Sequence, residues 1–524
     1  MHWADVIAER LAAQGDSHVV ATGITPSGPI HVGNMREVLT ADLVVRACER
    51  IGVDAELIYI ADTADPLRKV YPFLKEEEYE QHVGKALATL PSPDGEGSYS
   101  DYFLAPFFSA LDDLGVEYRV VDSHAAYLEG KYTQSVKTAI NNKVKIRDII
   151  SEVSQRPLDD DWFPYNPTDE NGNMHGLKVT NCDWPWVEWV AEDGRTGRTN
   201  IEKGGGKLPW RLDWPARWDW LDITFEGYGK DHSSAGGSWD TGQHLAPIFG
   251  SGPPMGMMYE WIYLKGKGAM ASSKGNTVSG KELLDIVPPE IMRYLITRVK
   301  PSKHIDFDPG EGLILLADEY ERLEQRYHTK LNKIVHKSLG ESSRKEQQLI
   351  DEARKFELAQ GIRSGTDFDS SLGISFSHLS TLCQIKSQNE DLLTSLARTH
   401  GVDVNQPDKR LIDRVKRMRN WVDSEWFPDN ARIQLAYSIK SADFTSDELK
   451  FLQMFSQLIA NSEWVEDSLL TTIRETTSNS ELEPRQAFTT LYRALLNRDR
   501  GPKLAALLVE LGQNNVTSLL DQLS

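Results

Sequence analysis

The chain has 524 residues, of which 40% are hydrophobic and 26% charged, an ordinary globular composition for roughly three folding units. This composition excludes a disulfide-stapled miniprotein, a collagen-like fibre and a wholly disordered chain. With 58 Lys and Arg against 78 Asp and Glu, the formal charge is −20, so a nucleic-acid partner would need a local basic face.

The cysteines and the apolar segments indicate the compartment. Cys48, Cys182 and Cys383 are far apart and form no CxxC pair, so we expect no structural disulfide and a reducing environment. The first residues do not resemble a secretory signal, and no run of about 18 apolar residues occurs. We therefore expect a cytoplasmic monomer without a membrane partner.

Strand-like and helix-like segments alternate over the first 300 residues. Short apolar runs predict strands at 18–24, 55–61, 116–121, 222–228 and 257–264. Helical spacing of apolar residues predicts helices over 34–51, 103–114 and 131–150. Strands separated by helices form right-handed crossovers, so the sequence predicts an α/β fold with a doubly wound, parallel, Rossmann-type catalytic domain.

Residues 155–207 interrupt this alternation and are rich in Asp, Asn, Gly and Pro. We interpret them as a subdomain inserted between two halves of the catalytic domain, 1–154 and 208–315. Seven tryptophans lie between Trp184 and Trp220, which fits either an exposed aromatic wall or a Trp-rich core.

Helical periodicity dominates after about residue 315, as in 317–338, 411–422 and 484–497. We expect an all-α C-terminal domain over 316–524, with a possible division into two subdomains near 440–446.

The first strand and the first helix are joined by TPSGPIHVGN, residues 25–34. Proline and glycine favour a tight turn, and Asn34 is a candidate N-cap of the helix. A helix start offers free N–H groups to phosphate, and His31 and Asn34 are spaced to donate hydrogen bonds beside it. A capped helix with a packed histidine is the structural alternative. No P-loop motif occurs.

A second motif, KGKGAMASSKGN at 265–276, follows the last predicted strand. Lys274 with the hydroxyl groups of Ser272 and Ser273 could neutralise a leaving pyrophosphate. Taken alone, the segment could also be a solvated basic loop. Both motifs fall at the carboxyl ends of strands, where ligands bind doubly wound sheets.

These motifs resemble a known family. PIHVGN resembles the HIGH signature of class I aminoacyl-tRNA synthetases, with Asn34 in place of the second histidine, and MASSK resembles their KMSKS signature, with Lys274 as its final lysine. GYGKDH at 227–232 resembles a turn of the glutamyl and glutaminyl subclass. Longer blocks are similar to the class I lysyl-tRNA synthetases: TGITPSGPIHVGN, DPLRKV, KLPWRLDWPARW, GKDHSSAGGSWDTG, YEWIYLKGKG and NRDRGPKL.

The resemblance implies an enzyme that activates L-lysine with ATP to lysyl-adenylate and transfers it to the 3′ end of tRNA(Lys). Mg²⁺ should accompany the ATP. The residues expected to be catalytic are His31, Asn34 and Lys274. The residues expected to bind ATP are Thr25, Pro26, Ser27, Gly28, His31, Gly33, Asn34, Asp231, His232, Met270, Ser272, Ser273 and Lys274.

The charge pattern agrees with a cationic amino acid. Glutamyl-type enzymes carry an arginine on the first strand, whereas no Arg or Lys occurs between Leu11 and Met35 here. A lysine substrate favours carboxylates and aromatic faces. The residues expected to bind lysine are Gly23, Thr25, Asp62, Asp65, Trp218 and Trp220, although any one carboxylate could instead cap a helix.

Relatives in this family commonly carry CxxC zinc pairs in the insertion. Here the region offers only Cys182 and His175, too few ligands for a structural zinc site. We predict that zinc is absent from this insertion, and we assign no residue as a metal ligand.

A protein this acidic must gather its cations to hold tRNA. On the helix that includes 409–419, the side chains of Arg410, Arg414 and Arg417 share a face. The resemblance points to the helical domain and its tail as the tRNA-reading part. The residues expected to bind tRNA are Arg410, Arg414, Arg417, Arg498, Arg500 and Lys503, while a solvated helix face remains the alternative.

Three other functions stay open on the sequence. The chain could be a class I synthetase for glutamate, cysteine or arginine. It could be a small-molecule nucleotidyltransferase of the HxGx type, although a long helical half argues against that. It could also be a non-catalytic tRNA-binding relative, which the retention of His31, Gly33, Ser273 and Lys274 disfavours.

Overall fold

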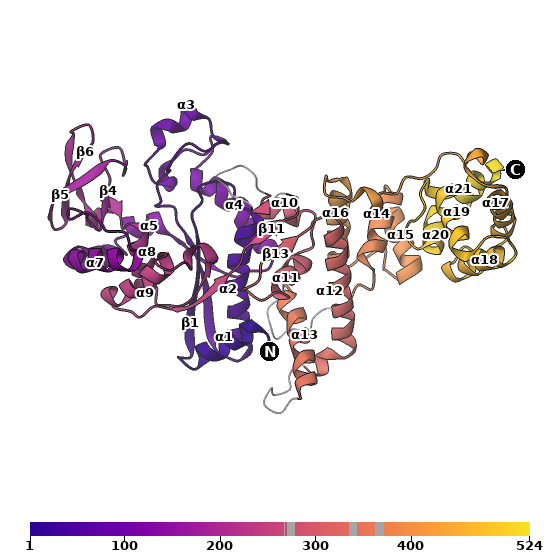
Figure 1. Cartoon of the computed structure of the whole chain (residues 1–524), viewed down its shortest axis with the longest axis horizontal. Coiled ribbons are helices and arrows are strands. Elements are labelled where there is room, and N and C mark those ends of the chain that lie inside the picture. The colour runs from indigo at the N-terminus through magenta and orange to yellow at the C-terminus, as the bar shows by residue number, and fades with distance from the viewer. Residues whose placement is uncertain (267, 270–277, 335–342, 362–370, 524) are drawn as a thin grey trace. The chain divides into compact units, whose positions relative to one another are not determined.

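The computed structural model describes residues 1–266, 268–269, 278–334, 343–361 and 371–523. The chain forms two compact units (Figure 1). Unit 1 comprises 1–284, 289–308 and 323–369, and unit 2 comprises 285–288, 309–322 and 370–524. This division differs from the boundary expected at 315/316, because α13 (Arg344–Ala359) packs against α11 (Pro289–Thr297) of unit 1.

Unit 1 is built on a five-stranded sheet whose strand order is β10-β9-β1-β2-β3. All four strand pairs are parallel. The strands are β1 (Ser17–Ile24), β2 (Asp54–Ala61), β3 (Arg119–Asp122), β9 (Ile223–Gly229) and β10 (Met255–Tyr259). The chain runs outward from β1 on one side and returns to its other side, which is the doubly wound, Rossmann-type order. The predicted fold class is confirmed.

Helices cover both faces of this sheet. On β1, Ala21 packs with Trp218 and Trp239 of α8 (Trp210–Trp220) and α9 (Ser238–Phe249), whereas the hydroxyl of the next residue, Thr22, donates to Glu37 of α2 (Val32–Arg50) at 2.7 Å. Successive strand residues point to opposite faces, so α2 lies on one face and the α8–α9 pair on the other. A further helix, α1 (Trp3–Ala12), packs against α2 (Figure 1).

Two elements differ from the sequence prediction. The helix expected over 131–150 is two helices, α6 (Thr133–Asn141) and α7 (Lys143–Ser154), because the Asn142 side-chain amide donates to the Thr138 carbonyl at 2.8 Å and closes the first. The strand expected over 257–264 is also divided. After β10 ends at Tyr259, β11 (Ile262–Leu264) joins a separate sheet with β12 (Gly268–Ala269) and β13 (Ile305–Phe307).

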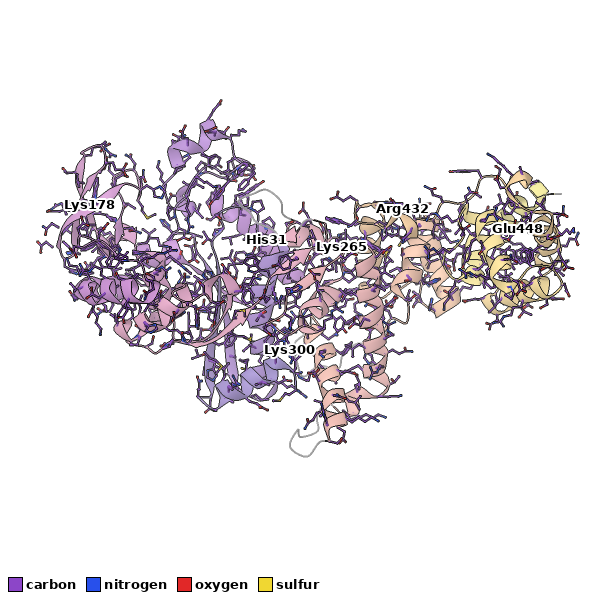
Figure 2. All side chains as sticks on the ribbon, viewed as in Figure 1. His31, Lys178, Lys265, Lys300, Arg432 and Glu448 are labelled. Atoms are coloured by element: carbon purple, nitrogen blue, oxygen red, sulfur yellow. The ribbon has the colours of Figure 1, made fainter. Side chains whose placement is uncertain are left out.

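The predicted insertion holds small antiparallel sheets. One contains β5 (Leu177–Asp183), β6 (Trp186–Ala191) and β7 (Thr196–Asn200), and the other contains β4 (Asn166–Pro167) and β8 (Gly206–Lys207). Val187 and Tyr165 pack in one core with residues of α6, α7 and α5 (Ser123–Leu128). Lys178 on β5 lies well away from His31 (Figure 2).

Further helices complete both units. Unit 1 also contains α3 (Glu76–Tyr79), α4 (Tyr99–Asp113) and α10 (Gly280–Leu284), and α12 (Glu311–Thr329) contributes to both units. Unit 2 contains α14 (Phe376–Ile385), α15 (Asn389–His400), α16 (Lys409–Asp423), α17 (Ser446–Ile459), α18 (Glu466–Ser478), α19 (Pro484–Leu496), α20 (Leu504–Leu511) and α21 (Gln513–Leu520). The last five of these share one apolar core. Among the described residues, no helix has the length and hydropathy of a membrane span.

Candidate active site

The start of α2 carries the first motif. His31 is the N-cap residue, and Asn34 occupies the third helical position, where its Oδ1 accepts from the His31 backbone N–H at 3.3 Å. The sequence suggested Asn34 as the N-cap, but the N-cap is His31. Asn34 acts from the third position, as the reciprocal partner of a capping box does. The turn thereby holds both side chains at the helix start, beside N–H groups that favour an anion.

The imidazole of His31 is neutral at physiological pH. Burial lowers the pKa of His31 to about 4. Its Nδ1 has no hydrogen-bond partner among the described residues. A buried polar atom without a protein partner is one that a ligand can satisfy.

A cavity of about 460 Å³ opens at the carboxyl ends of β1, β2 and β9. It lies where doubly wound sheets hold their ligands, and its volume suits a small molecule. Nine of the predicted residues line it: Gly23, Thr25, His31, Gly33, Asn34, Asp62, Asp65, Asp231 and His232. His31 is marked in Figure 2.

The turn residues Pro26, Ser27 and Gly28 do not line this cavity. The Ser27 carbonyl accepts from the Tyr99 hydroxyl at 2.8 Å, and a Cβ on Gly28 would lie 2.7 Å from the Phe73 ring. These residues shape the turn by packing outward. Met270, Ser272, Ser273 and Lys274 lie outside the described residues.

The aromatic lining differs from the prediction. Trp218 is 1% exposed and donates to Glu226 at 2.6 Å, and Trp220 packs edge-on against Tyr132, so neither lines the cavity. Trp210 and Trp214 do, with ring centroids 5.1 Å apart.

Sequence spacing separates only Trp220 from these residues. Trp210, Trp214 and Trp218 follow one another at intervals of four residues, about one helical turn, so they share a side of α8 from which Trp220 is displaced. Trp218 is kept from the cavity by its packing against Trp239. His232 meets the Trp214 ring edge-to-face at 5.3 Å, which joins the aromatic wall to the turn after β9.

The predicted lysine ligands Asp62 and Asp65 already have protein partners. Arg217 Nη2 donates to Asp62 at 2.8 Å, and Lys207 pairs with Asp65. Both cations also pair with Asp213. This cluster holds three carboxylates and two cations, so it has one negative charge in excess. Its carboxylates are largely neutralised within the protein.

The sequence analysis missed Glu37, which is free of any ion pair among the described residues. Its Oε1 accepts from the Thr22 hydroxyl at 2.7 Å and the Gly23 N–H at 2.9 Å, and its Oε2 accepts from the Tyr259 hydroxyl at 2.8 Å. Burial raises the pKa of Glu37. A signal existed, because Glu37 follows Asn34 by three residues and shares its side of α2.

Glu226 is the second missed carboxyl group. It lies on β9, lines the cavity, and accepts from the indole N–H groups of Trp214 at 2.9 Å and Trp218 at 2.6 Å. Burial raises the pKa of Glu226 to about 7. The only feature of the sequence that could have pointed to Glu226 is that it is the one acidic residue in the strand β9.

No cluster of three or more His, Cys, Asp or Glu side chains suited to a metal occurs in the described part of the chain. Cys182 is a free thiol on β5, and the His175 backbone N–H donates to Asn173. The absence of zinc stays a prediction.

The expected tRNA-binding residues have different exposures. Arg410 is half-buried and pairs with Asp408 at 2.9 Å, whereas Arg414 and Arg417 are each only 9% exposed. Two of the three arginines of the predicted basic face are therefore buried, on a helix that packs against α14. Arg498 donates to the Asn430 carbonyl at 3.1 Å, and Arg500 and Lys503 are exposed.

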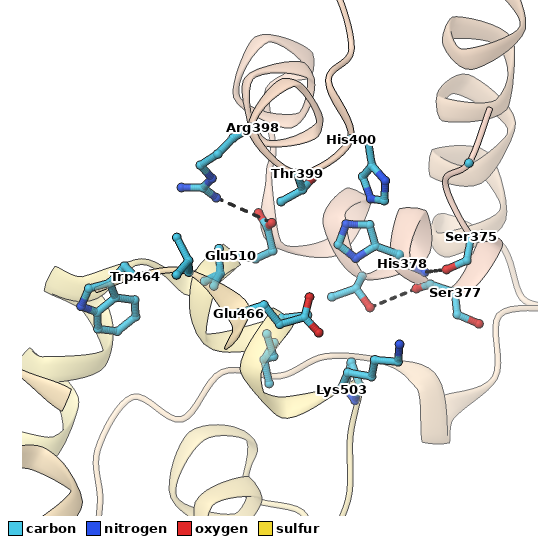
Figure 3. A pocket seen from close by; sticks show the side chains of 17 residues that line it. Ser375, Ser377, His378, Arg398, Thr399, His400, Trp464, Glu466, Lys503 and Glu510 are labelled. Atoms are coloured by element: carbon cyan, nitrogen blue, oxygen red, sulfur yellow. Dashed lines mark hydrogen bonds and ion pairs between the residues drawn. The ribbon is translucent and has the colours of Figure 1, made fainter. Parts of the chain in front are cut away.

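Unit 2 contains a second cavity of about 460 Å³, lined by residues of α14, α15, α18 and α20 (Figure 3). The rings of His378 and His400 lie 5.3 Å apart, and Arg398 reaches the buried Glu510 at 3.7 Å. Lys503 borders this cavity. It is the one predicted tRNA-binding residue that does so.

The fold and the first cavity define a class of α/β proteins in which a doubly wound parallel sheet carries a ligand-sized cavity at its carboxyl edge. The chain matches the family described as tRNA synthetases class I (K) over residues 1–359. It belongs to that family.

Relatives extend over nearly the whole chain. A lysine–tRNA ligase from Picrophilus torridus is 36% identical over 98% of this chain and 98% of its own, and one from Methanosarcina barkeri is 40% identical over 96% and 94%. A solved glutamate tRNA ligase from Elizabethkingia meningosepticum is 11% identical, with a TM-score of 0.46 over 97% of this chain and 99% of that one.

Proposed function

We propose that this protein activates L-lysine with ATP and transfers the lysyl group to tRNA(Lys). The observation that carries the choice of amino acid is Glu37, a half-buried carboxyl group held by neutral donors and facing the cavity. A carboxylate without a protein cation is a favourable partner for a desolvated ammonium group.

The rest of the lining suits the same substrate. Trp210 and Trp214 offer flat apolar faces to a methylene chain and π-faces to an ammonium group. Five carboxyl groups line the cavity, but Asp62 and Asp65 pair with Arg217 and Lys207. Glu37, Glu226 and Asp231 remain, against the guanidinium of Arg68. A cationic amino acid is therefore favoured over glutamate.

In the first step, an oxygen of the lysine carboxylate forms a bond to the α-phosphorus of ATP. The bond from that phosphorus to the bridging oxygen breaks, and pyrophosphate leaves with the electron pair. No proton transfer or covalent enzyme intermediate is needed. His31, as a neutral imidazole, and Asn34 would donate hydrogen bonds to phosphate oxygens beside the start of α2, and Lys274 would neutralise the leaving group.

In the second step, a terminal ribose hydroxyl of tRNA attacks the carbonyl carbon of lysyl-adenylate. AMP leaves, and the hydroxyl proton passes to solvent or to the departing phosphate. Mg²⁺ supplied with ATP would withdraw charge from the phosphates. The described residues offer it no three-ligand cluster, which fits an ion held mainly by phosphate and water oxygens. Arg500 and Lys503 are exposed cations of unit 2 that could contact the tRNA backbone.

Lysine-dependent ATP–pyrophosphate exchange tests this function, run with and without tRNA and with glutamate, cysteine and arginine in place of lysine. We expect exchange with lysine and lysyl-tRNA formation in the complete reaction. Exchange with another amino acid alone, or nucleotidyl transfer to a small molecule without tRNA, would overturn the proposal.

A further inference from the structure

Arg36 of α2 is a buried cation with an unusual set of partners. Arg36 is only 1% exposed, and its guanidinium forms no ion pair among the described residues. Its Nη1 donates to the Trp261 carbonyl at 3.2 Å, and its Nη2 donates to the carbonyls of Pro301 at 3.0 Å and Lys303 at 2.6 Å. Burial lowers the pKa of Arg36 to about 10, so the guanidinium stays charged at neutral pH.

A buried guanidinium without a carboxylate is costly unless its N–H groups are satisfied, and here backbone carbonyls satisfy them. These carbonyls belong to two segments far apart in sequence from α2. The segments also bond to each other, because the Glu260 N–H donates to the Pro301 carbonyl at 2.9 Å and the Ile305 N–H donates to Trp261 at 3.1 Å. Arg36 thus fastens both to the helix that carries His31 and Asn34.

One of these segments forms a wall of the active-site cavity. Trp261 and Ile262 line it, at the point where the chain leaves β10 and enters β11. The Lys230 ammonium lies 4.5 Å from the centre of the Trp261 ring and 2.6 Å from the Glu260 carboxylate. Lys230 directly precedes Asp231 and His232, the residues that we assign to the nucleotide. The Trp261 wall therefore adjoins the nucleotide end of the cavity.

The Glu37 pocket does not depend on Arg36 in the same way. Glu37 is the next residue on α2, but its partners are Thr22 and Gly23 of β1 and Tyr259 of β10. Those strands belong to the central sheet, whose parallel pairing holds Tyr259 up to the residue before the segment at 260–262. Loss of Arg36 should disturb one end of the cavity and spare the other.

The geometry points to Arg36 as a positioning residue for nucleotide activation: by holding the Trp261 and Ile262 backbone against α2, it fixes the nucleotide wall relative to His31 and Asn34. It touches no reacting atom. This inference rests on the proposed function for the identity of the reaction, but the nucleotide-binding measurement below does not need the amino acid to be lysine.

The test compares Arg36→Met and Arg36→Lys with the wild type, using the full chain, tRNA and lysine-dependent ATP–pyrophosphate exchange. We expect Arg36→Met to lower kcat/KM for ATP by about 10- to 100-fold, the size of a lost charged hydrogen-bond set, with the KM for lysine changed less than about threefold. Arg36→Lys should retain an intermediate activity, because a lysine can reach fewer of the four carbonyls that the guanidinium bonds, those of Trp261, Lys300, Pro301 and Lys303. Calorimetric titration with ATP alone should show the same loss.

Arg354→Met is the matched control. Arg354 is 2% exposed in the same unit and pairs with Asp5 at 2.8 Å, away from the cavity. This variant should lose stability without losing affinity for ATP. Equal kinetic effects of Arg36→Met and Arg354→Met, measured where circular dichroism shows both folded, would overturn the positioning role.

If Arg36→Met does not fold, Arg36→Ala with added methylguanidinium replaces it. Recovery of ATP affinity that saturates with the added cation supports the inference, and stability recovered without ATP affinity refutes it. Absence of lysine activation in the wild type, together with intact ATP binding that Arg36→Met abolishes, would refute the proposed function and leave the role of Arg36 standing.

Discussion

The hydroxyl of Tyr259 donates to Oε2 of Glu37 at 2.8 Å, joining the last strand of the central sheet to the helix that follows the first. The two residues are 222 positions apart in sequence. Together with Thr22 and Gly23, Tyr259 holds the half-buried carboxyl group of Glu37 toward the cavity. No cation of the described chain pairs with this carboxyl, which is why it is the residue best suited to an ammonium group of the substrate.

Replacing Glu37 with Gln should weaken lysine binding specifically. The substitution keeps the size of the side chain and removes its charge, so a charged hydrogen bond worth about 1.5–3 kcal/mol is lost. We expect the KM for lysine to rise about 10- to 150-fold in pyrophosphate exchange, with little change in the KM for ATP. Glu56→Gln is the control, since Glu56 is exposed and pairs with Arg119 at 2.8 Å. An unchanged KM for lysine would remove Glu37 from the substrate site.

Asp65 should prove to be mainly a structural partner of Lys207. Both side chains are buried, and removing one charge leaves the other uncompensated, which costs about 3–5 kcal/mol. We expect Asp65→Asn to lower the unfolding midpoint strongly. The double variant Asp65→Asn with Lys207→Met should regain much of that stability. If instead the KM for lysine rises in both variants while stability hardly changes, Asp65 binds the substrate directly.

Lysine binding should depend on pH through Glu226. Burial holds the pKa of Glu226 at about 7, so the carboxylate forms, and attraction for a cationic substrate grows, as pH rises through 7. We expect the KM for lysine to fall between pH 6 and 8, and Glu226→Gln to flatten that limb. A limb retained in Glu226→Gln would assign the titration to another group.

The same group has the opposite effect on stability. The folded state holds the Glu226 proton more tightly than the unfolded chain does, so the unfolded state binds fewer protons between pH 4.5 and 7 and the free energy of unfolding falls as pH rises. A pKa raised from 4.5 to about 7 corresponds to about 3 kcal/mol. Urea unfolding should therefore show that the free energy of unfolding of Glu226→Gln, relative to that of the wild type, increases by about that amount between pH 4.5 and 8.

His31 should contribute as a neutral donor without titrating in the working range. Because the pKa of His31 lies near 4, its imidazole is uncharged throughout the reaction at any pH above about 5.5. We expect His31→Gln to lower kcat by about 10²–10³, as expected for a lost donor to developing charge, without changing the shape of the pH profile from 6 to 8. A limb near pH 6.5 that disappears in His31→Gln would show that the imidazole is charged in the complex.

Lys274→Ala should cost about 2–4 kcal/mol of transition-state stabilisation, expressed as a fall in kcat for adenylate formation. The comparison is Lys265→Ala, in the same basic stretch, whose ammonium pairs with Asp308 at 2.7 Å. Single-turnover adenylate formation distinguishes the two. Equal rates in Lys274→Ala and the wild type would deny this lysine a role in the chemistry.

The sequence alone determined the class of fold and predicted where a ligand site should lie. Apolar runs of strand length alternating with helical periodicity are local patterns, and crossover handedness then allows few topologies, so the parallel sheet followed directly. The motif at 25–34 and the turn at 231–232 were found because strand ends and helix starts are also local features. Family resemblance added the chemistry that those positions serve.

Only the tertiary structure decided which polar groups face the ligand. Asp62 and Asp65 looked available in sequence, but they are neutralised by Arg217 and Lys207, which lie 155 and 142 residues away. Glu37 and Glu226 looked like ordinary residues within a helix and a strand, yet they line the cavity and form no ion pair within the described part of the chain. Pairing between distant charges depends on how layers pack, and no local periodicity encodes it.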